Sequence, residues 1–334
     1  MAFGACILDA EGLRLSPEEK ALFREVDPFG FILFARNIDT PDQVRALCDD
    51  LRESVGREAL ITVDQEGGRV QRLRAPHWRE WPAPRDVAQR AGEDAAEAMY
   101  LIYRIIAAEL HALGIDSNCA PMVDVLQPDT HEFLLSRCYG ADVGRIAELG
   151  RSVASGLMDG GVLPVMKHMP GHGRAPLDSH FDLPRVTASR DVLQSTDFAP
   201  FRALSDLPMG MTSHVVFEAI DDQPATLSAK LLQVMRDDIG FQNLIMTDDM
   251  SMKALQGSDI EKCCAAHAAG CDAILYCNQP LADRRAVAEA VGRMTPEAQA
   301  RAEQALAMRK TSDDVDIPAL ERKLNALLGG TLHG

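Results

Sequence analysis

Short apolar segments alternate with longer stretches of helical periodicity along almost the whole chain, and this alternation restricts the possible folds more than any other feature. Eight segments have the length and apolar content of buried strands: residues 4–8, 30–34, 59–63, 115–120, 162–166, 209–213, 243–246 and 272–276. Helical patterns follow them at residues 17–26, 40–54, 93–113, 145–158, 191–205, 229–239, 259–269 and 282–293. A strand–helix unit repeated about eight times predicts a (β/α)8 TIM barrel.

The length of the chain fits one barrel. It has 334 residues, and α/β barrels commonly run past ~250 residues as a single domain. We expect the barrel over about residues 4–293 and a C-terminal helical extension over residues 294–334, with helices at 296–308 and 317–328. No long linker and no low-complexity segment separates these parts. The sequence therefore predicts a single catalytic domain with extra C-terminal helices.

Charge and composition restrict the partners. Acidic residues outnumber basic ones 50 to 34, which gives a net charge of −16 and disfavours a nucleic-acid or anionic-membrane partner. No apolar run approaches the ~20 residues that span a bilayer, and the N-terminus lacks the basic region of a signal peptide. The eight cysteines include no Cys-x-x-Cys pair, so neither a zinc knuckle nor a disulfide framework is predicted. We expect a cytoplasmic protein without a cofactor; the oligomeric state is not predicted.

Polar residues directly follow several of the predicted strands. They are Asp64, Lys167, His168, His214 and Asp248. In a parallel barrel the carboxyl ends of all strands meet at one face, which carries the active site. The sequence therefore predicts that these residues share a pocket.

The residue types at these positions suit chemistry on a sugar. An aspartate held ionised at a strand end, such as Asp248, is a competent nucleophile toward an anomeric carbon. Lys167, Arg72 and Arg137 can donate hydrogen bonds to hydroxyl groups, and Asp64 can accept them. Together these residues predict a site that binds a polyol through hydrogen bonds.

His180 follows Asp178 by two residues, in a segment that begins with the glycines Gly171 and Gly173. A carboxylate that accepts from one ring nitrogen raises the pKa of the imidazole and leaves the other nitrogen to exchange protons. The glycines would let the segment move. We therefore expect His180 to be a general acid and base. His172, between the glycines, is interpreted as a structural turn residue.

The stretch KHMPGHG at residues 167–173, followed by DSH at 178–180, resembles the signature of family-three glycoside hydrolases of the β-N-acetylhexosaminidase type. Further segments resemble the family through most of the chain: GFILFARN at 30–37, DQEGGRV at 64–70, APMVDV at 120–125, MTSHVV at 211–216, TDDMSM at 247–252 and AGCD at 269–272. The long histidine-containing motif is specific, whereas a barrel alone would not be.

The resemblance implies a TIM barrel that hydrolyses terminal β-linked N-acetylglucosamine with retention. Single-domain bacterial members of the family act in the cytoplasm on muropeptides, which are N-acetylglucosaminyl-anhydro-N-acetylmuramic acid with or without peptide, in cell-wall recycling. Carried over by motif position, Asp248 would be the nucleophile and His180 the acid/base, with Asp178 as its partner. The residues that would bind the terminal sugar are Asp64, Arg72, Arg137, Lys167 and His168.

The chain departs from the expected family pattern at Gln65 and Asn118. Three other functions are also compatible with the sequence. One is a β-glucosidase of the same family, and another is a non-catalytic sugar-binding protein. The third is a metal-dependent TIM-barrel hydrolase that would use His168, His172 and His180 as ligands.

Overall fold

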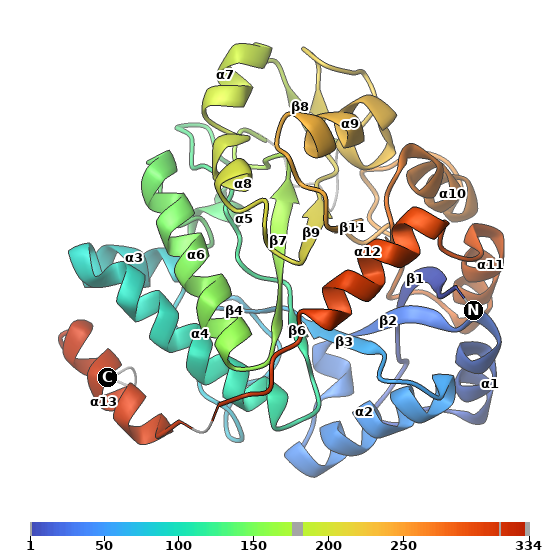
Figure 1. Cartoon of the computed structure of the whole chain (residues 1–334), viewed down its shortest axis with the longest axis horizontal. Coiled ribbons are helices and arrows are strands. Elements are labelled where there is room, and N and C mark those ends of the chain that lie inside the picture. The colour runs from blue at the N-terminus through green and yellow to red at the C-terminus, as the bar shows by residue number, and fades with distance from the viewer. Residues whose placement is uncertain (1, 176–182, 314, 331–334) are drawn as a thin grey trace.

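The computed structural model describes residues 2–175, 183–313 and 315–330. Its centre is a parallel sheet of eight strands in the order β11-β9-β7-β6-β3-β2-β1-β12 (Figure 1). The strands are β1 (Gly4–Asp9), β2 (Pro28–Leu33), β3 (Leu60–Val63), β6 (Ser117–Asn118), β7 (Leu163–Met169), β9 (Met209–Thr212), β11 (Leu244–Met246) and β12 (Ile274–Leu275). Neighbouring strands of this sheet follow one another among its strands along the chain, except β1 and β12, which are its first and last strands in sequence.

The first and last strands of this order also meet, which closes the sheet. Met246 forms a parallel bridge with Ala273, and the N–H of Thr247 donates to the carbonyl oxygen of Ala273 at 3.0 Å. The predicted (β/α)8 TIM barrel is therefore confirmed. All residues of β1, β2, β3, β7, β9 and β11 are buried. Burial on both faces of a strand produces the continuous apolar runs from which the strands were predicted.

Helices cover the outside of the barrel (Figure 1). Those of eight or more residues are α1 (Pro17–Val26), α2 (Pro41–Val55), α3 (Pro84–Ala91), α4 (Ala95–His111), α6 (Val143–Asp159), α9 (Ala229–Asp237), α10 (Asp259–Ala269), α11 (Leu281–Val291), α12 (Pro296–Ala307) and α13 (Ile317–Leu327). With the exception of residues 191–205, every predicted helix begins and ends within two residues of its expected bounds. In the described ranges, no helix combines the length and apolar character needed to cross a membrane.

The predicted helix over residues 191–205 is wrong. The structure has two short helices instead, α7 (Arg190–Ser195) and α8 (Ala199–Ala203), and Pro200 lies in the first turn of α8. A proline inside a continuous helix would remove one hydrogen bond and collide with the carbonyl group four residues earlier, here that of Thr196. The same residue is well tolerated at the start of a new helix.

The observed strands differ from the predicted lengths by up to four residues, and two of these differences affect the site. The segment expected as a strand over residues 162–166 forms β7 (Leu163–Met169), so Lys167 and His168 lie within the strand rather than after it. The strand expected over residues 115–120 is reduced to β6 (Ser117–Asn118). A short antiparallel hairpin that was not predicted, β4 (Gln65–Gly67) and β5 (Val70–Gln71), follows β3. This hairpin carries part of the site.

Candidate active site

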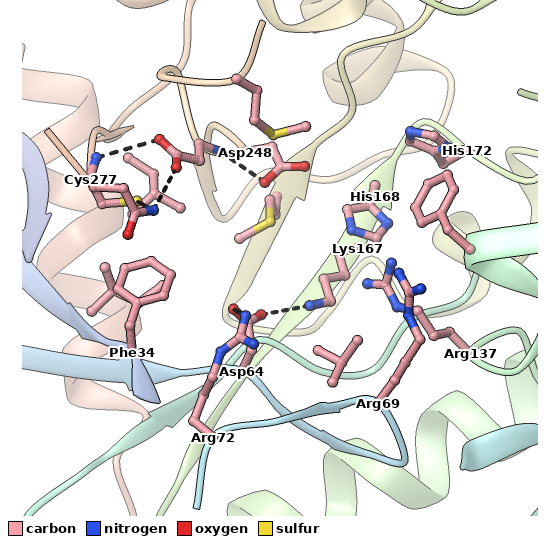
Figure 2. A pocket seen from close by; sticks show the side chains of 18 residues that line it. Phe34, Asp64, Arg69, Arg72, Arg137, Lys167, His168, His172, Asp248 and Cys277 are labelled. Atoms are coloured by element: carbon pink, nitrogen blue, oxygen red, sulfur yellow. Dashed lines mark hydrogen bonds and ion pairs between the residues drawn. The ribbon is translucent and has the colours of Figure 1, made fainter. Parts of the chain in front are cut away.

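A cavity of about 500 Å³ lies at the carboxyl ends of the barrel strands (Figure 2). This volume is in the range usual for small-molecule sites, about 300–1,000 Å³. Every described residue that was assigned a catalytic or sugar-binding role lines the cavity: Asp64, Arg72, Arg137, Lys167, His168 and Asp248. The other two, Asp178 and His180, fall outside the described residues.

Asp64 directly follows β3 and holds two of the cations predicted to bind sugar. Its carboxylate accepts from Arg72 Nη2 and from Lys167 Nζ, each at 3.0 Å. Burial alone would raise the pKa of Asp64, but the Lys167 and Arg72 cations hold that pKa well below its usual range. The wall therefore presents an ionised acceptor flanked by two fixed donors.

Glu66, which the sequence interpretation missed, links Lys167 to Arg137. Its carboxylate lies 2.6 Å from Lys167 Nζ and accepts from Arg137 Nε and Nη2 at 2.9 and 2.8 Å. Burial would raise the pKa of Glu66, but the Arg137 and Lys167 cations lower it to about 2. The carboxylate is 1% exposed and does not line the cavity, so it orients two cations from behind. The available signal was an acid two positions after Asp64, on the same side of an extended segment.

Asp124 is the second residue that was missed, and it fixes His168. One oxygen of Asp124 lies 2.7 Å from His168 Nδ1, and the other accepts from the backbone N–H of His172 at 2.6 Å. Burial would raise the pKa of Asp124, but His168 beside it lowers that pKa. Because an ionised carboxylate needs a donor, His168 carries a proton on Nδ1, and its Nε2 is the nitrogen available to a ligand.

His172, expected to be a structural turn residue, also lies in the cavity wall. Its ring meets those of His168 and Phe133 edge to face, with centroids 5.6 and 5.5 Å apart. Burial lowers the pKa of His172 to about 4. The ring is therefore uncharged at neutral pH and forms part of the rigid support of His168.

Asp248 lies two residues after the end of β11 and across the cavity from Asp64 (Figure 2). One of its oxygens accepts from the backbone N–H of Asp249 at 2.8 Å. The carboxylate of Asp249 accepts from the backbone N–H groups of Ser251 and Cys277 at 3.0 and 3.4 Å. Both residues line the cavity, but the carboxylate of Asp249 is held by backbone N–H groups and so shapes the loop.

His214 does not join this cavity, contrary to the prediction from the strand ends. β9 ends at Thr212, and the His214 side chain is fully buried beside the barrel wall. Its Nδ1 lies 2.8 Å from the Thr226 hydroxyl, and its Nε2 lies 3.1 Å from the carbonyl oxygen of Asp249. Burial lowers the pKa of His214. His214 therefore supports the loop that carries Asp248.

The two departures from the family pattern form part of the framework. The backbone N–H of Gln65 donates to Asn118 Oδ1, and Asn118 Nδ2 donates to the Gln65 carbonyl, both at 3.0 Å. Gln65 Oε1 accepts from the backbone N–H groups of Arg72 and Leu73 at 2.9 and 3.1 Å. These bonds tie the hairpin that carries the sugar-binding candidates to the end of β6.

Metal ligation was the alternative reading of the histidines. Within the described ranges, no group of three or more His, Cys, Asp or Glu side chains is arranged to hold a metal ion. The ligand set considered from the sequence includes His180, which lies outside those ranges. In the described part of that set, His168 already uses Nδ1 for Asp124.

Comparison with known proteins places the chain in a family. Residues 8–308 match the glycosyl hydrolase family 3 N-terminal domain. A beta-hexosaminidase of Alkalilimnicola ehrlichii is 39% identical over 288 residues, which are 84% of this chain and 82% of the relative. A beta-hexosaminidase of Methylobacillus flagellatus is 38% identical over 290 residues, with the same coverage.

A solved structure agrees with these sequence relatives. NagZ from Neisseria gonorrhoeae, in complex with N-trifluoroacetyl-D-glucosamine, matches with a TM-score of 0.86 and 30% identity over 100% of this chain and 98% of that one. The match of fold, sequence and length extends over the whole barrel. The chain therefore belongs to glycosyl hydrolase family 3 and is a glycoside hydrolase.

Proposed function

We propose that this glycoside hydrolase is a retaining exo-β-N-acetylglucosaminidase that removes terminal β-linked N-acetylglucosamine from muropeptides in the cytoplasm. The observation that carries the proposal is the cavity in which Asp248 lies opposite the cluster of Asp64, Arg72 and Lys167. The names of the sequence relatives and the N-acylated glucosamine bound by the Neisseria protein support the sugar. The resemblance to single-domain bacterial enzymes supports the muropeptide substrate.

In this proposal the charged cluster binds the terminal sugar. Asp64 accepts hydrogen bonds from sugar hydroxyls, while Arg72, Lys167 and Arg137 donate to them. His168 adds its Nε2, because Asp124 occupies Nδ1. Because ion pairs already fix these side chains, binding of the sugar costs little side-chain conformational entropy.

The reaction takes place in two steps. In the first, Asp248 attacks the anomeric carbon, the glycosidic C–O bond breaks, and His180 gives its proton to the departing oxygen. In the second, water attacks the anomeric carbon of the glycosyl-enzyme, His180 takes a proton from that water, and Asp248 leaves as a carboxylate. Two inversions at one carbon give retention. Asp178 orients the imidazole of His180 by accepting from one ring nitrogen.

Steady-state kinetics of two variants test the proposal. Asp248→Ala is expected to abolish hydrolysis of aryl N-acetyl-β-glucosaminides. His180→Ala is expected to slow substrates with poor leaving groups far more than activated aryl substrates, because only the former need a proton. Equal losses on both substrate types would remove His180 from the acid role.

A β-N-acetylglucosaminidase and a β-glucosidase of the same family differ in the sugar that they release. Comparing aryl N-acetyl-β-glucosaminide with aryl β-glucoside at matched concentrations decides between them. We expect the N-acetylated sugar to be turned over faster. Faster turnover of the glucoside would identify a β-glucosidase of the same family instead.

A further inference from the structure

The β4–β5 hairpin presents an exposed cation, Arg69, at the wall of the cavity (Figure 2). Two glycines before it, Gly67 and Gly68, have φ values of +105° and +58°, which side chains rarely adopt. The N–H of Gly68 donates to the carbonyl oxygen of Trp81 at 2.8 Å. A Cβ atom on Gly67 would lie only 2.5 Å from the carbonyl oxygen of Pro82. The tip of the hairpin is thus held closely, and the position of the Arg69 backbone is fixed.

The positive charge of Arg69 is not neutralised by an acidic residue, unlike the charges of the other cations that line the cavity. Four lysine or arginine side chains line the cavity, and three of them pair with Asp64 or Glu66. Arg69 is the fourth, and no carboxylate of the described residues lies within ion-pair distance of it. This cation stands out in a chain whose net charge is −16.

An aromatic ring supports the guanidinium group. The Cζ atom of Arg69 lies 5.9 Å from the centroid of the Phe133 ring, within the range of a cation–π contact. Phe133 itself is buried. A guanidinium group held in this way keeps its planar set of N–H donors for a carboxylate, which it can bind through two parallel hydrogen bonds.

We propose that Arg69 binds a carboxylate on the aglycone of the substrate. The inference rests on the proposed function, in which the terminal sugar lies between Asp64 and Asp248. The bound aglycone must then extend from the sugar toward solvent, where Arg69 is exposed. Arg69 is thus a specificity-determining residue that favours an acidic leaving group over a neutral one of the same size.

Two aryl substrates of nearly equal size test this inference. They are the N-acetyl-β-glucosaminides of 3-hydroxybenzoic acid and 3-hydroxybenzamide, which differ in one negative charge. The measured quantity is the ratio of kcat/KM for the acid to kcat/KM for the amide. Comparing this ratio between variants cancels the difference in leaving-group chemistry.

Arg69→Met, which keeps the length of the side chain, is expected to lower the ratio about tenfold, as the loss of one exposed charge-assisted contact implies. Arg69→Lys is expected to restore part of it, because the charge returns without the planar fork. The ratio in the wild type should also fall when the salt concentration is raised from about 0.05 to 0.5 M. Arg24→Met is the matched control, since Arg24 is also exposed, lies on α1 and is no part of the cavity wall.

Three results would overturn the inference. One is an unchanged ratio in Arg69→Met while the amide is still hydrolysed, and it leaves the proposed function intact. The second is an equal loss of the ratio in Arg24→Met, which would make the effect one of net charge. The third is failure of the wild type to hydrolyse either substrate, which overturns the proposed function together with the inference.

Discussion

Replacing Glu66 by glutamine removes one buried charge and nearly preserves the shape of the side chain. In the native protein Glu66 makes three short contacts with cations, two to Arg137 and one to Lys167. One carboxylate oxygen, Oε1, contacts both Lys167 Nζ and Arg137 Nη2, and the other accepts from Arg137 Nε. A glutamine whose carbonyl oxygen takes the Oε1 position keeps two contacts without their charge, and its NH2 group faces the Arg137 Nε donor. Losing one contact to a charged group and leaving a buried donor against another donor, at ~1.5 kcal/mol each, predicts a destabilisation of ~3 kcal/mol. This agrees with the ~3–5 kcal/mol that follows the breaking of buried ion pairs.

Equilibrium urea unfolding measures this change, and kinetics measure its effect on the site. Because the group that holds both Lys167 and Arg137 loses its charge and one of its contacts, we expect kcat/KM for an aryl N-acetyl-β-glucosaminide to fall ~10²-fold in Glu66→Gln. Glu148→Gln is the control, since Glu148 forms a half-exposed pair with Arg145 at the surface. That change should cost no more than ~1 kcal/mol and leave the kinetics unaltered.

The acid dependence of stability should change as well. The folded-state pKa of Glu66 is lowered to about 2, from ~4.3 in an unfolded chain. Its contribution is therefore fully present above pH ~4.3 and is lost as the pH falls through about 2. Glu66→Gln should lack this part of the acid dependence. A destabilisation below ~1 kcal/mol, with unchanged kinetics, would refute the role given to Glu66.

Three further changes probe other parts of the structure. Asp124→Asn should reduce kcat/KM ~10-fold or more, because an amide can leave His168 in the wrong tautomer; no loss would contradict the assignment. Gly173→Ala should destabilise the fold by at least ~2 kcal/mol in urea, since its Cβ would lie 1.9 Å from the carbonyl oxygen of Val125; an unchanged midpoint would refute this. His172 has its pKa lowered to about 4 by burial, so the unfolded chain takes up the proton first as the pH falls below ~6.5. Unfolding free energy should therefore decrease by up to ~1.4 kcal/mol per pH unit toward pH 4, and His172→Gln should remove that slope.

The parts of the fold that could be predicted are those with local signals. The capping box of Ser16 and Glu19 and the proline at position 17 mark the start of α1, and the observed helix has the predicted bounds. The bounds of α10, which opens with the pair Ser258 and Glu261, were also predicted without error. The β4–β5 hairpin was missed because all its residues except Val70 are polar or glycine, and its conformation depends on contacts with residues 81–83.

The residues of the candidate site also fall into those with a local sequence signal and those without one. Asp64, Lys167 and Asp248 could be found because each occurs where a buried apolar strand gives way to polar residues. Glu66 and Asp124 were missed, because their roles depend on partners 71 and 44 residues away in the sequence. Only the closed barrel brings these segments together. Buried carboxylates of this kind are found by asking what balances each cation of a predicted site.

Trapping the covalent intermediate tests the central claim most directly. The protein would be incubated with an activated fluorinated N-acetylglucosaminide, whose fluorine slows the second step more than the first. It would then be digested and sequenced by mass spectrometry. The proposed mechanism predicts one added sugar on the peptide that spans β11 and its following loop, with fragmentation placing it on Asp248. A sugar attached to any other residue, or inactivation without a covalent adduct, would contradict it.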